Sequence, residues 1–260
     1  MMMTAKAEDY LHRDRLRTIS LLKYLQSFPD DTRLLHAEGP EGEGVMLLLR
    51  TAVSPYDRET YSGTRHVSFI ASDHPDLTLR LVAQVPDEGP IVFKLSQPAD
   101  EAAVATRFRL RRTTAFHSFR LADRTDWAEA SGLVRAAPSE AAFALFEERG
   151  YERGWLISLV DAGRAFVVEA PAEGTTLSAC FVFENGPGLW EIGGLATDPA
   201  ARRQGLARQV VQTAFLEVQR RGHIARYVAE ETNGPSLALA RALGLHAFQC
   251  LTHFLSDDSR

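Results

Sequence analysis

Cysteine is scarce in this chain of 260 residues, which contains only Cys180 and Cys250. Two cysteines cannot form a disulfide scaffold, and both lie in apolar stretches, so we expect buried free thiols. The eight histidines show neither H-E-x-x-H nor a Cys/His ligand spacing, so no metal site is expected. No apolar run approaches a membrane span, and residues 1–10 lack the apolar core of a signal peptide. These absences predict a cytoplasmic protein without a membrane partner.

An excess of positive charge is also missing, since 29 Lys and Arg stand against 34 Asp and Glu, for a net charge of −5. This balance argues against nucleic acid as the main partner. Hydrophobic residues make up 45% and charged residues 24%, which are ordinary values for a globular protein. The length allows one large domain or two modest ones.

The two common nucleotide-binding loops are absent as well. Without G-x-x-x-x-G-K-[ST] there is no nucleoside-triphosphate P-loop, and without G-x-G-x-x-G after a strand there is no Rossmann dinucleotide site. A different loop is present, Arg202-Arg203-Gln204-Gly205-Leu206-Ala207. It follows the apolar run Trp190–Ala196 and the turn Thr197-Asp198-Pro199, and it leads into a long amphipathic helix that ends near Gly222.

This order of strand, loop, glycine and helix suits a phosphorylated ligand. The first N–H groups of a helix lack intrahelical partners, and the macrodipole adds partial positive charge there. Gly205 lets the backbone come close to a diphosphate, and Arg202 and Arg203 supply cationic donors. Taken alone, an arginine pair before an alanine-rich helix is equally compatible with a solvated face.

The loop resembles the coenzyme A signature [QR]-x-x-G-x-[GA] of the GNAT acyltransferase superfamily, with Arg202, Gly205 and Ala207 at its defining positions. The resemblance extends over about residues 135–255. The further matching segments are Leu195-Ala196-Thr197-Asp198-Pro199, Asn233-Gly234-Pro235-Ser236 and Leu243-Gly244-Leu245.

The resemblance implies a mixed α/β fold and acetyl-CoA as co-substrate, with the diphosphate on N–H groups from Arg203 to Arg208. The implied coenzyme A contacts are Leu195, Ala196, Thr197, Arg202, Arg203, Gln204, Gly205, Leu206, Ala207, Arg208 and Asn233.

Glu191 is the candidate general base. It lies fourteen residues before Gly205, where several family members carry a catalytic glutamate. On a regular strand Glu191, Gly193 and Leu195 share one face. The alternative is an exposed strand glutamate paired with an arginine. The pair Gly193-Gly194 indicates a bulge or a close ligand approach, or equally a tightly packed helix, and a free N–H nearby suits the thioester oxygen.

The general acid stays open. Many family members have a tyrosine seven residues after the asparagine, but that position is Ala240 here. Ser236, Tyr227, His253 and bulk water all remain candidates for protonating the leaving thiolate.

The chain divides into two halves. We expect an N-terminal α/β half over residues 1–121, a connection over 122–138 and a GNAT-like domain over 139–260. In the first half we expect helices at 8–27, 76–84 and 100–107 and strands at 45–51, 66–71, 90–95 and 112–121. In the second half we expect helices at 139–149, 206–221 and 233–243 and strands at 166–170, 177–185, 189–196, 225–229 and 246–255. This tandem resembles the glycine N-acyltransferase-like branch, with a smaller, degenerate GNAT-like first half that walls the acceptor side.

The sequence thus predicts an N-acetyltransferase that moves acetyl from acetyl-CoA to an amine with Glu191 as base. The acceptor is a small-molecule amine or a peptide or protein amine. The rival is a non-catalytic acyl-CoA-binding regulatory module, which Ala240 favours and Glu191 disfavours. An interaction scaffold would require the loop match to be chance.

Overall fold

The chain has a mixed α/β fold, seen in a computed structural model that describes residues 2–86, 89–122, 127, 131–172 and 174–256. Its strands hydrogen-bond in the order β1-β2-β3-β4-β11-β5-β10-β9-β8-β7-β6. Two compact units are present: unit 1 comprises residues 1–116 and 249–260, and unit 2 comprises residues 117–248.

Two strands supply residues to both units, β5 (Leu110–Arg120) and β11 (His246–Ser256). Residues 249–260, expected in the second domain, therefore group with unit 1. The reason is that the second part of β11 pairs antiparallel with β4 (Ile91–Leu95).

Unit 1 is an α/β unit whose strands were largely predictable. Besides β4 and its parts of β5 and β11, it contains α1 (Met2–Arg13), α2 (Ile19–Ser27), β1 (Thr32–Gly39), β2 (Gly42–Arg50), a 3-10 turn (Thr51–Val53), α3 (Pro55–Thr60), β3 (His66–Ser72), α4 (Pro75–Val82) and α5 (Pro98–Ala105).

Three features of unit 1 depart from the sequence prediction. The single helix expected over 8–27 is two helices. Strand β1 was missed because it is a half-exposed edge strand that carries polar residues, and it forms a hairpin with β2. The short helix α3 was missed too, although Ser54 caps its first turn.

Buried polar groups gather in unit 1 around Lys94. Its ammonium lies 2.6 Å from a carboxylate oxygen of Asp57, and both side chains are almost fully buried. Tyr61 and His253 also meet in the core, with 2.6 Å between the Tyr61 hydroxyl and the Nδ1 of His253. Burial, together with the charge of Lys94, lowers the pKa of His253 to about 2, so its imidazole is neutral.

Unit 2 follows the predicted order more closely. Its elements are β6 (Leu133–Arg135), α6 (Glu140–Glu147), α7 (Arg153–Asp161), β7 (Ala165–Ala172), β8 (Thr175–Gly186), β9 (Leu189–Thr197), a 3-10 turn (Pro199–Ala201), α8 (Leu206–Arg220), β10 (Ile224–Glu230) and α9 (Gly234–Ala242). Strand β6 lies within the expected connection, of which residues 123–126 and 128–130 fall outside the described ranges. Helix α7 was missed.

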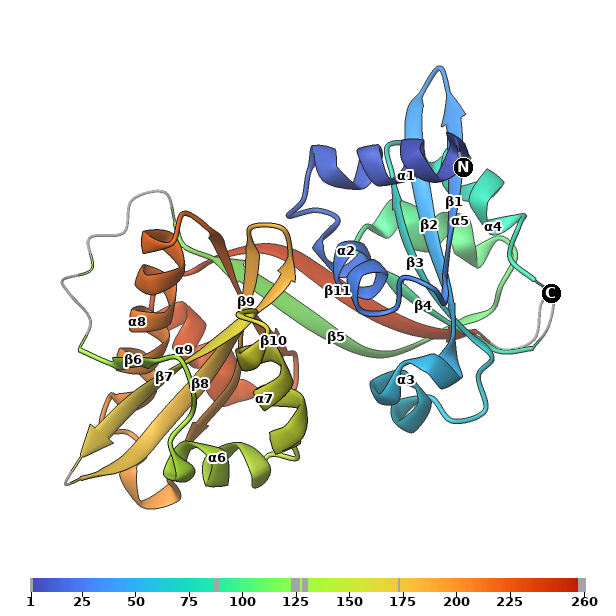
Figure 1. The fold of residues 1–260 in the computed structure, drawn as a ribbon. Coiled ribbons are helices and arrows are strands. Elements are labelled where there is room, and N and C mark those ends of the chain that lie inside the picture. The colour runs from blue at the N-terminus through green and yellow to red at the C-terminus, as the bar shows by residue number, and fades with distance from the viewer. Residues whose placement is uncertain (1, 87–88, 123–126, 128–130, 173, 257–260) are drawn as a thin grey trace. The chain divides into compact units, whose positions relative to one another are not determined.

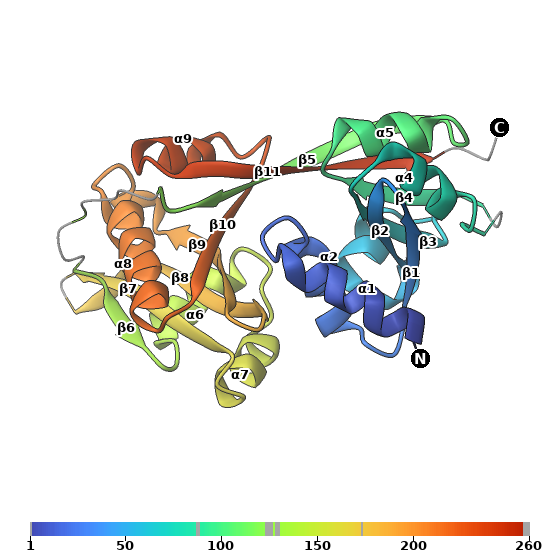
Figure 2. The same ribbon diagram turned by 90° about the horizontal axis from the view of Figure 1, so that it is seen from above.

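Helices cover both faces of the unit 2 sheet (Figures 1 and 2). Helices α8 and α9 pack on one face through Val211, Phe215 and Ala240. Helices α6 and α7 pack on the other face through Phe146 and Leu156. The sheet is therefore buried on both sides, and a ligand can reach its interior only where the strand pairing opens.

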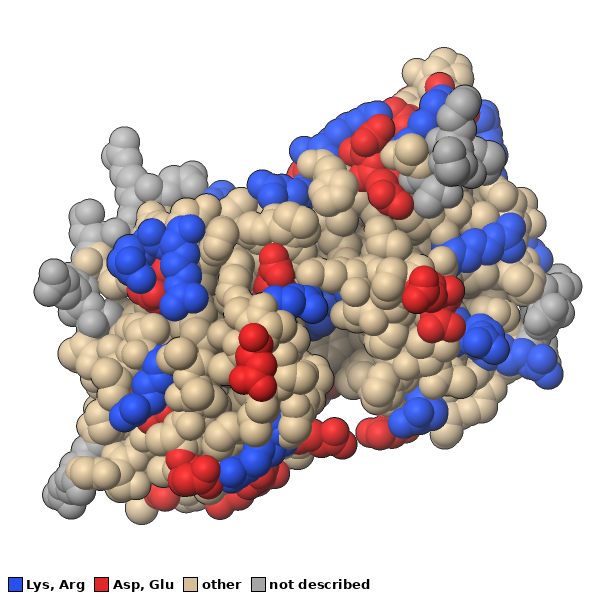
Figure 3. Space-filling view, in the orientation of Figure 1, with Lys and Arg blue, Asp and Glu red and all other residues tan. Residues whose placement is uncertain are grey.

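The face of the molecule drawn in Figure 3 shows no dominant sign of charge. Basic and acidic side chains are interspersed on the face in Figure 3. Within the described residues, no helix is long and apolar enough to cross a membrane, and no cluster of three His, Cys, Asp or Glu is placed to hold a metal. Both cysteines are free thiols, but only Cys180 is buried; Cys250 is exposed, so the expectation of two buried thiols was wrong. Cys250 lies near the middle of β11, where the apolar pattern of the sequence does not reveal which side chains face solvent.

The buried neutral His253 predicts acid sensitivity. Its folded pKa is lower than its unfolded value, so the unfolded state binds the extra proton and stability falls as the pH drops below about 6.5. Between pH 6.5 and 5.5 we expect the free energy of unfolding to fall by about 1 kcal/mol from this group, measured by urea titration. His253→Gln should remove this loss, and His12→Gln, at an exposed position of α1, should retain it. If the free energy of unfolding fell equally with pH in the wild type and in His253→Gln, the loss would not come from the buried neutral imidazole of His253.

Candidate functional site

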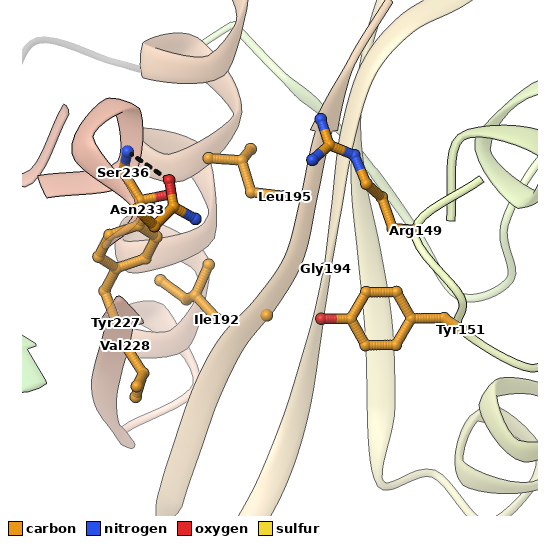
Figure 4. A pocket seen from close by; sticks show the side chains of 10 residues that line it. Arg149, Tyr151, Ile192, Gly194, Leu195, Tyr227, Val228, Asn233 and Ser236 are labelled. Carbon is orange, nitrogen blue, oxygen red and sulfur yellow. Dashed lines mark hydrogen bonds between the residues drawn. The ribbon is translucent and has the colours of Figure 1, made fainter. Parts of the chain in front are cut away.

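A break in strand pairing creates the candidate site of unit 2. Strands β9 and β10 run parallel and pair from Leu189 with Ile224 to Ile192 with Tyr227, and the described residues beyond them do not pair. A cavity of about 250 Å³ opens there. Its lining residues are Arg149, Tyr151, Ile192, Gly193, Gly194, Leu195, Tyr227, Val228, Asn233 and Ser236 (Figure 4).

A bulge in β9 accompanies this opening. Gly193 pairs with Phe181 of β8, whereas Ala196 pairs with Ala179, so β9 carries one extra residue over this stretch. Gly194 adopts a positive φ of 58°, and a Cβ there would overlap the Phe181 ring. Glycine is thus required for both its conformation and its size.

The bulge changes which way the following side chains point. A regular strand predicts Glu191, Gly193 and Leu195 on one face, and this prediction was wrong. Leu195 packs with the α8 face, next to the core that contains Ile192, while Ala196 packs with the α6 and α7 core. The extra residue reverses the alternation after Gly193.

The loop before α8 contains two residues in the left-handed conformation. Arg203 has a positive φ of 63°, rare outside glycine, and Gly205 has a φ of 84° at the N-cap of α8. Successive backbone groups in such conformations form anion-binding concavities. No other group lies within 4 Å of where a Cβ of Gly205 would be, so the space above the glycine is open.

The remaining side chains of the loop face solvent. The side chains of Arg202, Arg203, Gln204 and Arg208 are exposed. Arg202 Nε lies 3.5 Å from the carbonyl oxygen of Thr197, the last residue of β9. The N–H groups at the start of α8, including those of Leu206 and Ala207, have no intrahelical acceptor because of their position.

Asn233 links the cavity to α9. Its side-chain oxygen accepts the backbone N–H of Ser236 at 3.1 Å and so caps this helix. Ser236 also hydrogen-bonds the buried hydroxyl of Tyr227, whose pKa is raised mainly by burial. Of the three side chains considered as general acid, Tyr227 and Ser236 line the cavity. His253 belongs to unit 1, and its neutral imidazole is a poor proton donor.

Glu191 lies next to the opening but is not among the residues that line the cavity. It is 9% exposed, and Asn185 Nδ2 donates to its carboxylate at 2.5 Å. Arg226 Nη1 lies 3.5 Å from the same oxygen, and Arg226 Nε donates to Ser118 Oγ at 3.1 Å. The arginine partner considered from the sequence is present, but the glutamate is buried rather than exposed.

Sequence reasoning missed Arg149 and Tyr151. They follow α6, and in Figure 4 the Tyr151 hydroxyl points toward Gly194. Burial and the charge of Glu191 raise the pKa of Tyr151, while a backbone hydrogen bond from Gly194 and the charge of Arg149 act in the opposite direction. No motif marks this segment, and only the glycine between the two residues, with a φ of 82°, signals a helix end.

Solved structures share this fold at low sequence identity. A GCN5-related N-acetyltransferase from Kribbella flavida is 17% identical over 95% of this chain and 98% of that one, with a TM-score of 0.54. One from Sphaerobacter thermophilus is 15% identical over 92% and 85%, with a TM-score of 0.54. A tandem GNAT protein from the clavulanic acid biosynthesis pathway is 16% identical over 94% and 88%, with a TM-score of 0.50. These likenesses concern the fold.

The sequence itself carries the family assignment. No curated protein matches the chain. Residues 133–245 match the family model described as "Acetyltransferase (GNAT) family", and this range contains the opened strand pair, the bulge and the loop before α8. The C-terminal half of this chain therefore belongs to the GNAT acetyltransferase family.

Proposed function

We propose that the chain is an acyl-CoA-dependent N-acyltransferase that transfers acetyl from acetyl-CoA to a primary amine. The observation that carries this proposal is the opening between β9 and β10 at the Gly194 bulge. Strand β9 leads from this cavity directly into the loop and the exposed N-terminus of α8. One short segment thus offers both a slot for a thioester arm and a cradle for a diphosphate.

The residues present fit coenzyme A. Beyond Ile192, the β10-facing edge of β9 is unpaired, so those backbone groups of Leu195, Ala196 and Thr197 that point to this edge are available to amides of a pantetheine arm. The N–H groups from Arg203 to Arg208 suit the diphosphate, and Arg202 and Arg203 add charge without a carboxylate partner among the described residues. Asn233 lines the same cavity.

The reaction requires a neutral amine, a stabilised oxyanion and a proton for the leaving group. The amine nitrogen forms a bond to the thioester carbonyl carbon, the carbon–sulfur bond breaks, and the proton lost by the amine goes to a base. A backbone N–H at Leu195 or Ala196, next to the bulge, suits the developing oxyanion. The thiolate takes a proton from Tyr227, Ser236 or water.

Glu191 is the proposed base. The neighbouring guanidinium of Arg226 favours the charged carboxylate, and burial keeps the group in place beside the opening. A carboxylate fixed in this way can accept the proton of the amine directly or through one water. The charge of Glu191 is felt at Tyr151, which lines the cavity, so the carboxylate is electrostatically coupled to the site.

A second function has one observation in its favour. Ala240 is fully buried in the core, at the position where many family members carry the tyrosine that acts as general acid. The loss of this tyrosine fits a module that binds acyl-CoA without turnover. Thiol release from acetyl-CoA with a panel of amines separates the two functions. Tight binding without release by any amine would favour the regulatory module.

Gly205 gives the test of the donor site. Gly205→Trp should weaken CoA binding by about tenfold or more, measured by calorimetry, because the side chain would fill the open space above the loop. Gly222→Trp is the matched control, since Gly222 follows α8, has a φ of 76° and also faces open space. Both variants carry similar backbone strain, but only the first should lose CoA. If both bind CoA like the wild type, the donor site lies elsewhere.

Glu191→Gln tests the base. Turnover should fall by about 10²- to 10⁴-fold while CoA binding persists, and raising the pH should restore part of it because more amine is then neutral. Glu184 of β8 has a partly exposed carboxylate that pairs with Arg164. The variant Glu184→Gln removes this carboxylate and should leave turnover unchanged. Because Glu191→Gln leaves Arg226 buried without its counter-ion, thermal unfolding must show that both variants are folded. Near-normal turnover of a folded Glu191 variant at neutral pH would refute this role.

A further inference from the structure

The proposed base belongs to a distinct row of side chains on the α6 and α7 face of unit 2. Phe183 of β8, Glu191 of β9 and Arg226 of β10 are cross-strand neighbours and therefore share one face. Phe183 packs against the core formed by α6 and α7, which identifies the face. An amine that approaches Glu191 must come from this side.

Two exposed aromatic rings lie on the same face. Tyr151 is 37% and Trp155 40% exposed, and their rings are stacked with centroids 6.5 Å apart and planes 22° apart. Both rings contact Phe181 edge-on, at 4.9 and 5.5 Å, and Trp155 also contacts Phe183 at 5.8 Å. Phe181 and Phe183 thus fix the two rings while leaving part of each open, an arrangement that suits a flat apolar ligand group.

One positive charge beside these rings lacks a carboxylate partner within the part of the chain that the structure describes. Arg149 lines the cavity together with Tyr151 (Figure 4). No carboxylate pairs with it among the described residues. Arg153, four residues later, is by contrast fully engaged, since it binds Glu140 and Glu147 and stacks over Phe143. Because Arg226 is balanced by Glu191, Arg149 is the guanidinium of the cavity lining that has no carboxylate partner among the described residues.

We propose that Arg149, Tyr151 and Trp155 form the acceptor subsite and that the acceptor is an aromatic α-amino acid. Arg149 pairs with the carboxylate of the acceptor, Tyr151 and Trp155 receive its ring, and its amine faces the opening beside Glu191. The product is an N-acyl amino acid, formed with one carbon–nitrogen bond as one carbon–sulfur bond breaks and CoA leaves as the thiol. This inference rests on the proposed acyltransferase function and specifies its substrate class.

A panel of acceptors tests the class. Thiol release from acetyl-CoA is measured with phenylalanine, tryptophan, phenethylamine, leucine, spermidine and a lysine-containing peptide, using the full chain. The aromatic amino acids should give the highest kcat/KM. Removing the carboxylate, as in phenethylamine, or the ring, as in leucine, should each lower kcat/KM by about tenfold.

Matched variants show which residues produce the preference for the carboxylate of the acceptor and which produce the preference for its ring. Arg149→Gln should abolish the advantage of phenylalanine over phenethylamine, mainly through KM, while Arg153→Gln should retain it. Trp155→Ala should abolish the advantage of phenylalanine over leucine, while Ile157→Ala should retain it, since Ile157 lies on the same helix and is 39% exposed. CoA affinity should stay the same in all four variants.

The outcomes separate this subsite from the proposed function. Turnover that is highest with spermidine, the peptide or phenethylamine would overturn the subsite and leave the acyltransferase function intact. An Arg149 variant that loses activity equally with phenylalanine and phenethylamine would also overturn it. If no amine in a wider panel releases thiol although CoA binds, the proposed function itself fails.

Discussion

The left-handed conformation of Gly194 is the constraint on which the site depends. It allows β9 to carry one more residue than β8 over the same stretch, and the Phe181 ring lies where any larger residue would place its Cβ. The same stretch of β9 is where pairing with β10 ends, so one side of the strand bulges where the other side opens. A sheet covered by helices on both faces thereby gains access to solvent at its centre without losing its core.

Burial of charge next to this opening is the main energetic cost of the site. Glu191 and Arg226 are both nearly excluded from water, and their attraction alone offsets desolvation poorly. Hydrogen bonds from Asn185 to the carboxylate and from the guanidinium to Ser118 complete the network. Such a network holds a carboxylate in one orientation beside the cavity, which a solvated surface glutamate cannot achieve.

The sequence predicted what depends on local chemistry. The loop before α8, its glycine and the helix that follows are encoded within a short segment, so their place and conformation could be inferred. The face on which Leu195 lies could not be inferred, because the pair Gly193-Gly194 fitted a bulge, a close ligand approach or a packed helix equally, and only a bulge shifts the alternation by one residue. Arg149, Tyr151 and Trp155 were missed because the first two lie in the turn after α6 and the third in the short helix α7, which carries exposed apolar residues. Only tertiary contacts with Phe181 and Phe183 bring the Tyr151 and Trp155 rings together.

Unit 1 contains the same order of strand, helix and parallel strand, but its chemistry disfavours a phosphate. Strands β3 and β4 stay paired from His66 with Ile91 to Ile70 with Leu95, along the whole length of β4. The turn before α4 holds Asp73, which is occupied by Arg17 and Tyr10, and Asp76 lies in the first turn of the helix. A carboxylate at a helix N-terminus is itself stabilised by the dipole and repels an anionic ligand. Two similar backbones thus differ in their chemistry, because one keeps its strands paired and places acids where the other has an opening and arginines.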